Sequence, residues 1–252
     1  MIAVITGASS GIGRATALAF AREGYDVAVL ARRRELLESL LDEMKAVSAK
    51  GRYLAVSCDV SQTQDVQEAA NQVSQKLGDA HVLVNNAGAF EYAPFEKSSA
   101  QKTEEMIDVN VRGVIYVTKA FLPALKKTGT PKAPSKVINV SSISGLWGFS
   151  NMAVYTASKF AVTGLSSALS RELKHQNIRV SAIHPGPVRT KESPSGAAKK
   201  TMTMLPPQIA DQIVSLAGSS RRRLISHPVF TVLHWLDEVS PVLVDRVLKK
   251  IL

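Results

Sequence analysis

The chain has 252 residues, of which 45% are hydrophobic, which is enough apolar material to bury the core of one full domain. The formal net charge is +10, and the single cysteine, Cys58, cannot form an internal disulfide, so a reducing, cytoplasmic setting is expected. No stretch approaches the roughly 18 uninterrupted apolar residues of a membrane-spanning helix, and no charged leader precedes the first apolar stretch. We therefore expect one domain that does not cross a membrane.

The charge is unevenly distributed along the chain. Residues 1–125 carry 13 Lys and Arg against 15 Asp and Glu, whereas residues 126–252 carry 18 against 6. A basic half can attract nucleic acid, anionic lipid or an acidic substrate carrier. Because the sequence has no nucleic-acid motif and no basic residues interleaved with aromatic ones, nucleic acid is not expected as a partner.

The chain is predicted to begin with a strand, a glycine turn and a helix. Residues 2–6 are apolar, as in a strand buried on both faces, and residues 14–23 have a helical pattern. Between them lie Gly7, Gly11 and Gly13, whose spacing departs from the usual G-x-G-x-x-G. Such a turn brings the backbone and the positive end of a helix close to a pyrophosphate, so it favours a dinucleotide site.

The second predicted strand, residues 26–31, ends in Arg32, Arg33 and Arg34. At this point a dinucleotide-binding fold carries Asp or Glu for a free ribose 2′-hydroxyl, or Arg for a 2′-phosphate. The absence of an acid favours NADP(H), with Arg32 as the first candidate and Arg33 as the second. The other interpretation is a solvated start of the next helix.

Strand and helix then alternate. A helix at 34–49 is followed by a strand at 53–58, which ends at Asp59 and Val60, and a further helix leads to a strand at 81–84, which ends at Asn85, Asn86, Ala87 and Gly88. This rhythm predicts an α/β fold, a Rossmann-type doubly wound parallel sheet with helices on both faces. Ligands in such folds bind at the carboxyl ends of strands, where Asp59 and Asn86 fall, although Asx residues there also form turns.

The middle of the chain supplies further candidates. Residues 103–127 are predicted as one long helix that carries Asn110, either as a hydrogen-bonded packing residue or as part of a catalytic relay. A polar loop at 128–136 leads to a strand at 137–140, which ends at Ser141 and Ser142. A last strand, 180–183, runs into Pro185.

Tyr155 and Lys159 lie four residues apart in a predicted helix, residues 153–174. This spacing puts a phenol and an ammonium on one face, about one turn apart. A nearby ammonium favours phenolate, so we expect it to lower the pKa of Tyr155 towards neutrality.

Taken together, these motifs resemble the short-chain dehydrogenase/reductase family, over roughly the first three quarters of the chain. The resemblance implies a nicotinamide cofactor, NADP(H) in this branch, and interconversion of a carbonyl and an alcohol. It implies that Ser142 orients the carbonyl oxygen, Tyr155 exchanges the proton, Lys159 holds the nicotinamide ribose and Asn110 supports a water relay. Ser142 is preferred to Ser141 because it lies 13 residues before Tyr155, the usual offset in the family. The expected cofactor contacts are Gly7, Ser9, Ser10, Gly11, Ile12, Gly13, Arg32, Arg33, Asp59, Val60, Asn86, Ala87, Gly88, Tyr155, Lys159, Pro185, Gly186, Val188 and Thr190.

Beyond Thr190 the chain departs from the relatives that reduce 3-oxoacyl chains, which usually end in a strand closing on Asp-Gly-Gly. Residues 191–205 are expected to form a mobile segment beside the substrate cleft, followed by a helix at 207–217, a basic-edged strand at 221–225 and two apolar segments. We therefore predict an oxidoreductase for a hydrophobic metabolite, such as a lipid, a steroid-like compound or an acyl compound. The alternatives are a 3-oxoacyl-carrier-protein reductase and a non-catalytic NADP-binding sensor. A homodimer or homotetramer is expected, and no metal.

The final segment is predicted to be an amphipathic helix. Ser240 and Pro241 form a helix start, and an apolar stripe follows at helical spacing, Leu243, Val244, Val247, Leu248 and Ile251, with Arg246, Lys249 and Lys250 off the stripe. The stripe either packs on the neighbouring apolar segment or another subunit, or rests on an anionic membrane.

Overall fold

The structure is a computed structural model that describes residues 1–190, 202–237 and 239–251, the side chains of 245, 246 and 249–251 excepted. Seven parallel strands form one sheet in the order β3-β2-β1-β4-β5-β6-β7. Their bounds are β1 Ile2–Thr6, β2 Asp26–Ala31, β3 Tyr53–Ser57, β4 Val82–Asn85, β5 Ser135–Val140, β6 Ile178–His184 and β7 Arg223–Ile225. The predicted parallel, doubly wound sheet is confirmed.

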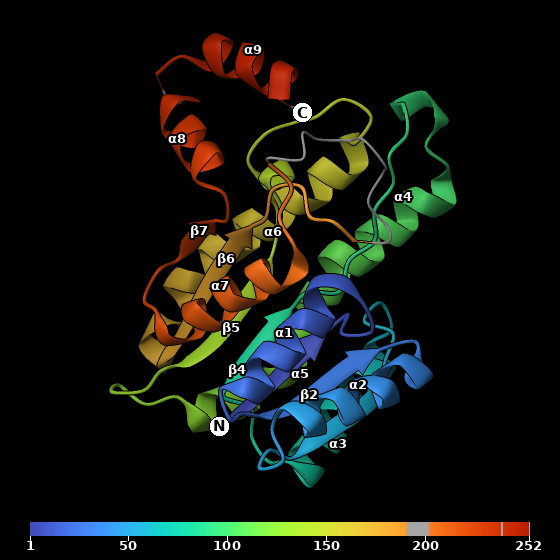
Figure 1. Cartoon of the computed structure of the whole chain (residues 1–252), viewed down its shortest axis with the longest axis vertical. Helices are drawn as coiled ribbons and strands as arrows, with labels where there is room; N and C mark the ends of the chain where they lie inside the picture. The colour runs from blue at the N-terminus through green and yellow to red at the C-terminus, as the bar shows by residue number, and fades with distance from the viewer. Residues whose placement is uncertain (191–201, 238, 252) are drawn as a thin grey trace.

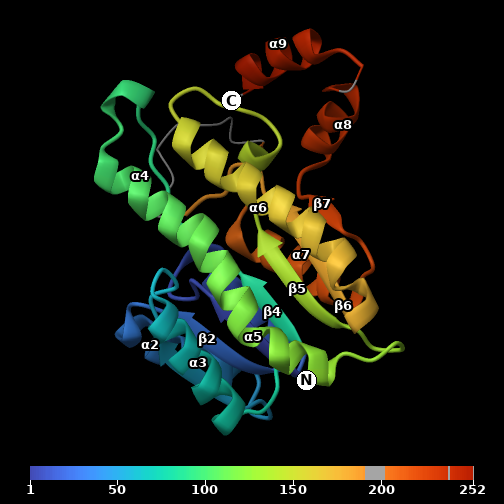
Figure 2. The same ribbon diagram turned by 180° about the vertical axis from the view of Figure 1, so that it is seen from behind.

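Helices cover both faces of the sheet (Figures 1 and 2). The α-helices are α1 Gly11–Arg22, α2 Arg34–Val47, α3 Thr63–Lys76, α4 Ala100–Ile107, α5 Val114–Thr128, α6 Ala153–Glu172, α7 Pro206–Gly218, α8 Pro228–Asp237 and α9 Pro241–Ile251. Short 3₁₀ turns lie at η1 Phe95–Lys97, η3 Ile143–Gly145 and η4 Lys174–Gln176. Helices α1, α2 and α7 pack on one face, and α3 and α5 pack on the other.

Alternation of side chains along each strand builds the two halves of the core. Val4 faces the α3 and α5 side, while its neighbour Ile5 faces the α1, α2 and α7 side. Leu83 and Val84 divide in the same way. Because both faces are covered, these strands are apolar throughout instead of alternating with polar residues.

The strand order reverses between β1 and β4. From β1 the chain continues to β2 and β3 on one side, and from β4 it continues to β5, β6 and β7 on the other. At such a switch point the connections leave in opposite directions, so a crevice opens beyond the carboxyl ends of the strands. The glycine turn after β1 and the Asn86 loop after β4 therefore face each other across the start of this crevice.

The long helix expected at residues 103–127 is interrupted. Between α4 and α5 lies a π-helical segment, η2 Asp108–Gly113, which contains Asn110. A π-turn inserts one residue into the helical path and redirects the side chains around it, and such turns are frequent at functional sites. Here it directs the Asn110 side chain into the protein, where it is fully buried.

The C-terminal part confirms the expected helix, strand and final helix. Helix α9 begins at Pro241, and the carbonyl of Ser240 accepts bonds from Leu243 and Val244. The predicted stripe is divided, however: Val244 and Leu248 are buried against α8, whereas Leu243 is exposed. Val244 and Leu248 therefore pack on the neighbouring apolar segment, and the alternative of membrane contact stays a prediction for the exposed part of the stripe.

The segment predicted to be mobile is residues 191–205, and residues 191–201 lie outside the described residues. Met204, in the described part, forms a parallel bridge with Val188. Within the described ranges, no helix combines the length and the apolarity that spanning a membrane requires.

Candidate active site

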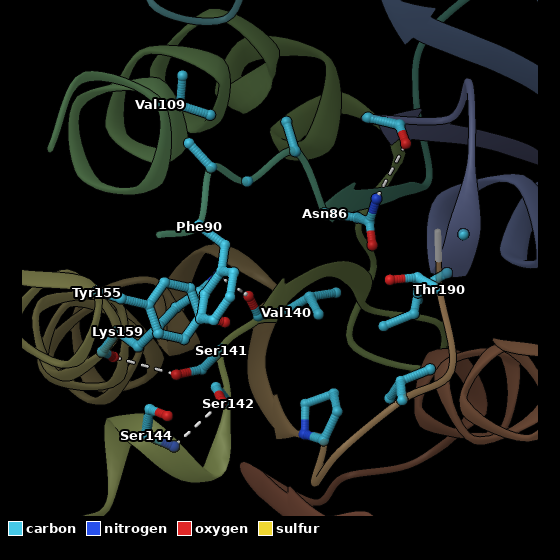
Figure 3. A pocket seen from close by; sticks show the side chains of 18 of the residues that line it. Asn86, Phe90, Val109, Val140, Ser141, Ser142, Ser144, Tyr155, Lys159 and Thr190 are labelled. Carbon is cyan, nitrogen blue, oxygen red and sulfur yellow. Dashed lines mark hydrogen bonds between the residues drawn. The ribbon is translucent and has the colours of Figure 1, made fainter. Parts of the chain in front are cut away.

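A pocket of about 1260 Å³ lies at the carboxyl ends of the strands. It is lined by every residue expected to contact cofactor or substrate apart from Gly13 and Asn110. Figure 3 shows Tyr155, Lys159 and Phe90 on one side of this space, with Ser142 nearby and with Asn86 and Thr190 at a different part of the pocket. The fold thus gathers residues that are distant in sequence around one cavity.

The glycine turn forms a cradle that a side chain would fill. Gly7 has φ of +65°, and a Cβ there would lie 2.7 Å from the backbone Cα of Ala87. Gly11 has φ of +54°, and a Cβ there would lie 3.3 Å from Cγ2 of Thr190. The Asn86 amide fixes the wall of the cradle by donating to the carbonyl of Thr6 at 3.0 Å. A narrow backbone channel at the start of α1 fits the pyrophosphate of a dinucleotide.

Two basic side chains line the pocket at the end of β2. The guanidinium of Arg33 donates to the hydroxyls of Ser9 and Ser10 at 2.9 and 3.3 Å, so it is fixed beside the glycine turn. Arg32 is exposed and lines the same end of the pocket, whereas Arg34 pairs with Glu38 at 2.9 Å and lies outside it. This arrangement gives positive charge where a dinucleotide carries its adenosine ribose.

The loop after β3 has a local structural role. Asp59 lines the pocket, and its carboxylate accepts bonds from the amide and the hydroxyl of Ser61, at 3.0 and 2.7 Å. The side chain of Asp59 therefore stabilises the turn itself, which is the second of the two interpretations of an Asx residue at this position.

The two serines after β5 diverge. The hydroxyl of Ser141 donates to the carbonyl of Lys159 at 3.1 Å and lies 3.1 Å from the hydroxyl of Thr163, so it is engaged with α6. The hydroxyl of Ser142 accepts from the amide of Ser144 at 3.1 Å, which leaves its own hydrogen to donate. Only the second arrangement leaves a hydroxyl that can serve a bound molecule, which favours Ser142 as the site residue.

Tyr155 and Lys159 extend from α6, where their spacing brings them together. The ammonium of Lys159 lies 5.6 Å from the centroid of the Tyr155 ring and donates to the carbonyl of Val140 at 3.1 Å. Lys159 is buried, and burial lowers its pKa to about 8.

The pKa of Tyr155 differs from the expectation. Burial raises it to about 12, and hydrogen bonding with Ser142 offsets part of this rise. The expected lowering by the Lys159 ammonium does not occur, because the cost of removing a phenolate from water dominates. The phenol of the free protein is therefore protonated at neutral pH and has a proton to donate.

Asn110 connects the π-helical segment to the site without lining the pocket. Its amide oxygen accepts from the Ala89 amide at 2.7 Å, and its nitrogen donates to the Ala89 carbonyl and to the Ser158 hydroxyl, both at 2.9 Å. These bonds hold the loop after β4 against α6, next to the helical turn that carries Tyr155. This geometry favours a positioning role, and the water relay stays a prediction.

Two residues of the site were not among the expected ones. The ring of Phe90 packs edge-on against Tyr155, with centroids 4.8 Å apart. His184 is fully buried at the end of β6, and its Nδ1 lies 3.0 Å from the carbonyl oxygen of Ser142. Both lie one or two residues from a recognised motif, Gly88 and Pro185, and this proximity was the signal available in the sequence.

The protonation of His184 follows from its surroundings. Burial lowers its pKa to about 4, so the imidazole is neutral at pH 7, and because a carbonyl only accepts, Nδ1 must carry the hydrogen. Among the described residues, Nε2 has no hydrogen-bond partner.

Part of the pocket lining is apolar, and one of its side chains, Phe90, packs against Tyr155. Five side chains from four parts of the chain line it: Phe90, Ile143, Phe149, Met152 and Leu248. Ile143 belongs to the same apolar cluster as the buried residues of α8 and α9, so the C-terminal helices form part of this wall.

Comparison with known proteins agrees with this geometry. Residues 1–200 match the family model described as short chain dehydrogenase. A 3-oxoacyl-[acyl-carrier-protein] reductase FabG from Thermotoga maritima is 31% identical over 240 residues, covering 92% of this chain and 95% of the relative.

Two solved structures are similar in fold along most of their length. An alcohol dehydrogenase from Thermococcus sibiricus, complexed with 5-hydroxy-NADP, has a TM-score of 0.81 at 31% identity and covers 89% of this chain and 94% of its own. A short chain dehydrogenase/reductase from Burkholderia phymatum, in complex with NAD, has a TM-score of 0.84 at 25% identity and covers 96% and 94%. The chain therefore belongs to the short-chain dehydrogenase/reductase family of oxidoreductases, which interconvert carbonyls and alcohols.

Proposed function

We propose that the protein is an NADP(H)-dependent oxidoreductase that interconverts a carbonyl and a secondary alcohol on a hydrophobic metabolite. The observation that carries this proposal is the grouping of Ser142, Tyr155 and Lys159 around one pocket whose other end is the glycine turn. The cofactor supplies a hydride when it is bound, and the chain's own residues do the rest.

Proton transfer and charge stabilisation are the tasks of the side chains. Reduction of a carbonyl builds negative charge on its oxygen, and donors that are already aimed at that oxygen stabilise the transition state more than the ground state. The Ser142 hydroxyl, which is hydrogen-bonded with Tyr155, can turn its hydrogen to the substrate oxygen and orient it, and the protonated phenol of Tyr155 delivers the proton. Lys159 holds the nicotinamide ribose with its ammonium.

The preference for the phosphorylated cofactor is supported by Arg33 and Arg32. A ribose 2′-phosphate is a dianion, for which a guanidinium fixed beside the glycine turn is a charge-assisted donor. The solved 5-hydroxy-NADP complex of the Thermococcus sibiricus relative is consistent with this choice, and the NAD complex of the Burkholderia phymatum relative makes cofactor preference the first property to measure.

A hydrophobic substrate is supported by the apolar wall around Tyr155. Phe90, Phe149 and Met152 offer aromatic and aliphatic contact, with the Ser142 and Tyr155 hydroxyls as the polar groups that fix orientation. A pocket of this composition selects for apolar surface near a single polar function.

The second candidate function is reduction of 3-oxoacyl chains on a carrier protein, which the similarity to FabG favours. Against it stands the end of the chain, where α8 and α9 follow β7 instead of the ending that such reductases usually have. Rates on a 3-oxoacyl carrier and on a free ketone of the same chain length distinguish the two.

The proposal is tested by following NADPH oxidation with a panel of ketones of increasing chain length. Activity should rise with chain length, and Tyr155→Phe should lower turnover by about 10²–10⁴-fold while NADPH still binds. Tyr116→Phe is the matched control, because its hydroxyl accepts from Arg112 on the surface. Binding of NADPH without turnover of any ketone or alcohol would indicate a cofactor sensor instead.

A further inference from the structure

The turn between α8 and α9 carries a cluster of exposed apolar side chains, which we call the apolar corner. It consists of Val232, Trp235, Leu236, Val239, Val242 and Leu243, whose exposed fractions run from 42% to 84%. The turn is tight, since the carbonyl of Leu236 accepts from the amides of Val239 and Ser240 at 3.0 and 2.8 Å. Single exposed apolar residues are ordinary, but a cluster of this kind marks a surface that meets an apolar partner.

The corner is held in place by the opposite faces of the same helices. Phe230 and Leu233 of α8 and Val244 and Leu248 of α9 are buried and pack together with Trp147. The Trp147 indole donates to the carboxylate of Asp237 at 2.9 Å, which ties the last turn of α8 to the body. Both helices therefore have apolar residues on two sides, and packing within the chain covers only one of these sides.

Positive charge lies just before α8 in the chain, and one of its arginines contacts this helix. Arg221, Arg222 and Arg223 are all exposed just before α8, and Arg223 lies 2.8 Å from Nε2 of His234, the neighbour of Trp235. Within the described part of the chain, none of these three arginines forms an ion pair with an acid. The surface thus combines large apolar side chains with unneutralised guanidinium groups.

We propose that the apolar corner docks the protein onto a lipid bilayer that carries anionic headgroups. Aliphatic side chains and an exposed tryptophan insert at the boundary of headgroups and acyl chains, while neighbouring arginines bind the phosphates. Figures 1 and 2 show α8 and α9 at one end of the molecule, so a flat surface can approach them without meeting the sheet.

A second copy of the chain fits this surface less well. Paired about a two-fold axis, the same residues of both copies face each other, so the three arginines of each chain gather at one interface. Like charges at short range oppose such pairing, whereas an anionic bilayer neutralises them. The positive charge of the three arginines before α8 is therefore the reason to choose lipid over self-association.

Docking has a consequence for the pocket. Leu248 lines the pocket from the inner face of α9, and Leu243 lies five residues, about one and a half turns, earlier on the exposed side of the same helix. One helix therefore lines the pocket with one residue and carries part of the docked surface with another, so docking would bring the pocket close to a substrate dissolved in the membrane.

The test uses the full-length protein with sedimented vesicles of phosphatidylcholine alone and of phosphatidylcholine with 30% phosphatidylglycerol. We expect binding to the anionic vesicles at low salt, weaker binding at 0.5 M salt, and little binding to the neutral ones. Tryptophan emission gives a second readout, because Trp235 is 70% exposed and Trp147 only 7%, so a blue shift on adding vesicles reports Trp235.

Variants separate the apolar contribution from the electrostatic one. Trp235→Gln with Val239→Gln should weaken the vesicle affinity at least about ten-fold, whereas Leu36→Gln with Phe95→Gln, exposed elsewhere, should leave it unchanged. Arg221→Gln with Arg222→Gln should weaken it about five-fold for each arginine at low salt, and Lys50→Gln with Lys76→Gln should have no comparable effect.

The proposal is overturned if the wild-type protein stays in the supernatant at low salt, or if it binds neutral and anionic vesicles equally. It is also overturned if the Trp235 and Val239 substitutions reduce the size of the assembly in light scattering and leave vesicle binding unchanged. That last result would make the corner an interface between copies of the chain.

Discussion

The Nδ1 atom of His184 lies 3.0 Å from the carbonyl oxygen of Ser142, and both residues are at the carboxyl ends of neighbouring strands. The imidazole is neutral and fully buried, so the bond fixes the backbone at Ser142 without adding charge to the site. Since the direction of the Ser142 hydroxyl depends on this backbone, we expect His184 to act on the reaction through Ser142, as a positioning residue.

His184→Phe keeps an aromatic ring but removes one of the two donors to the Ser142 carbonyl and leaves the Gly145 amide at 2.9 Å, at a cost of about 0.5–1.5 kcal/mol for one hydrogen bond. We expect kcat to fall while the dissociation constant of the cofactor stays the same. His184→Asn supplies an amide nitrogen close to the position of Nδ1, so it should recover most of kcat. Equal kcat values for the Phe and Asn variants would show that the bond has no part in catalysis.

The lowered pKa of His184 predicts acid sensitivity of the fold. The unfolded chain takes up a proton near pH 6.5, whereas the folded chain does so only near pH 4, so stability is present above 6.5 and is lost as the pH falls between these values. Between pH 7 and 5 the loss from this group is about 2 kcal/mol. Urea unfolding at both pH values should show a smaller loss in His184→Asn, and an identical loss in the two proteins would contradict the assignment.

Lys159 predicts a limb in the pH profile of activity. Its pKa is lowered to about 8 by burial, so its ammonium is present below that pH and is lost above it. We expect kcat/KM for ketone reduction to fall above about pH 8, because kcat/KM reports the ionisation of the free enzyme. Lys159→Arg should lower the overall rate and remove the limb, since guanidinium does not titrate in this range. A wild-type profile that stays flat to pH 10 would argue against this role.

Arg33 predicts the cofactor preference. Loss of a charge-assisted contact of about 1.5–3 kcal/mol should weaken NADPH binding about 10- to 150-fold in Arg33→Ala, with NADH nearly unchanged. Arg32→Ala should also weaken NADPH binding. We expect the larger loss of affinity for Arg33→Ala, because Ser9 and Ser10 fix the guanidinium of Arg33. Arg34→Ala is the control, since Arg34 pairs with Glu38 outside the pocket. Titration by fluorescence measures the affinities of the wild type and the three variants for NADPH and for NADH, and a wild-type preference for NADH refutes the assignment.

The fold was predictable because its signals are local. Apolar runs such as residues 2–6, the glycine turn, and the four-residue spacing of Tyr155 and Lys159 each depend on neighbours in sequence. The π-helical segment was not, because one extra residue in a helical path leaves the apolar pattern around Asn110 almost unchanged.

Contacts between residues on neighbouring strands also could not be predicted from the sequence. The bond between His184 and Ser142 depends on the pairing of β5 with β6, in which Val140 lies opposite Ile183. The raised pKa of Tyr155 depends on how deeply α6 buries the phenol, which the spacing of Tyr155 and Lys159 does not reveal. The exposure of Leu243 beside the buried Val244 likewise depends on where α8 stands.

The central claim is that the carbon of one substrate carbonyl takes a hydride from a nicotinamide cofactor and that its oxygen takes a proton from Tyr155. Its most direct test is a single turnover of NADPH deuterated at the transferring position of C4, with a long-chain ketone, followed by mass spectrometry of the alcohol. The account predicts one deuterium on the carbinol carbon with the wild-type protein and at least about 10²-fold less product with Tyr155→Phe at equal cofactor occupancy. Alcohol formed at the wild-type rate by Tyr155→Phe, or alcohol without deuterium, would contradict it.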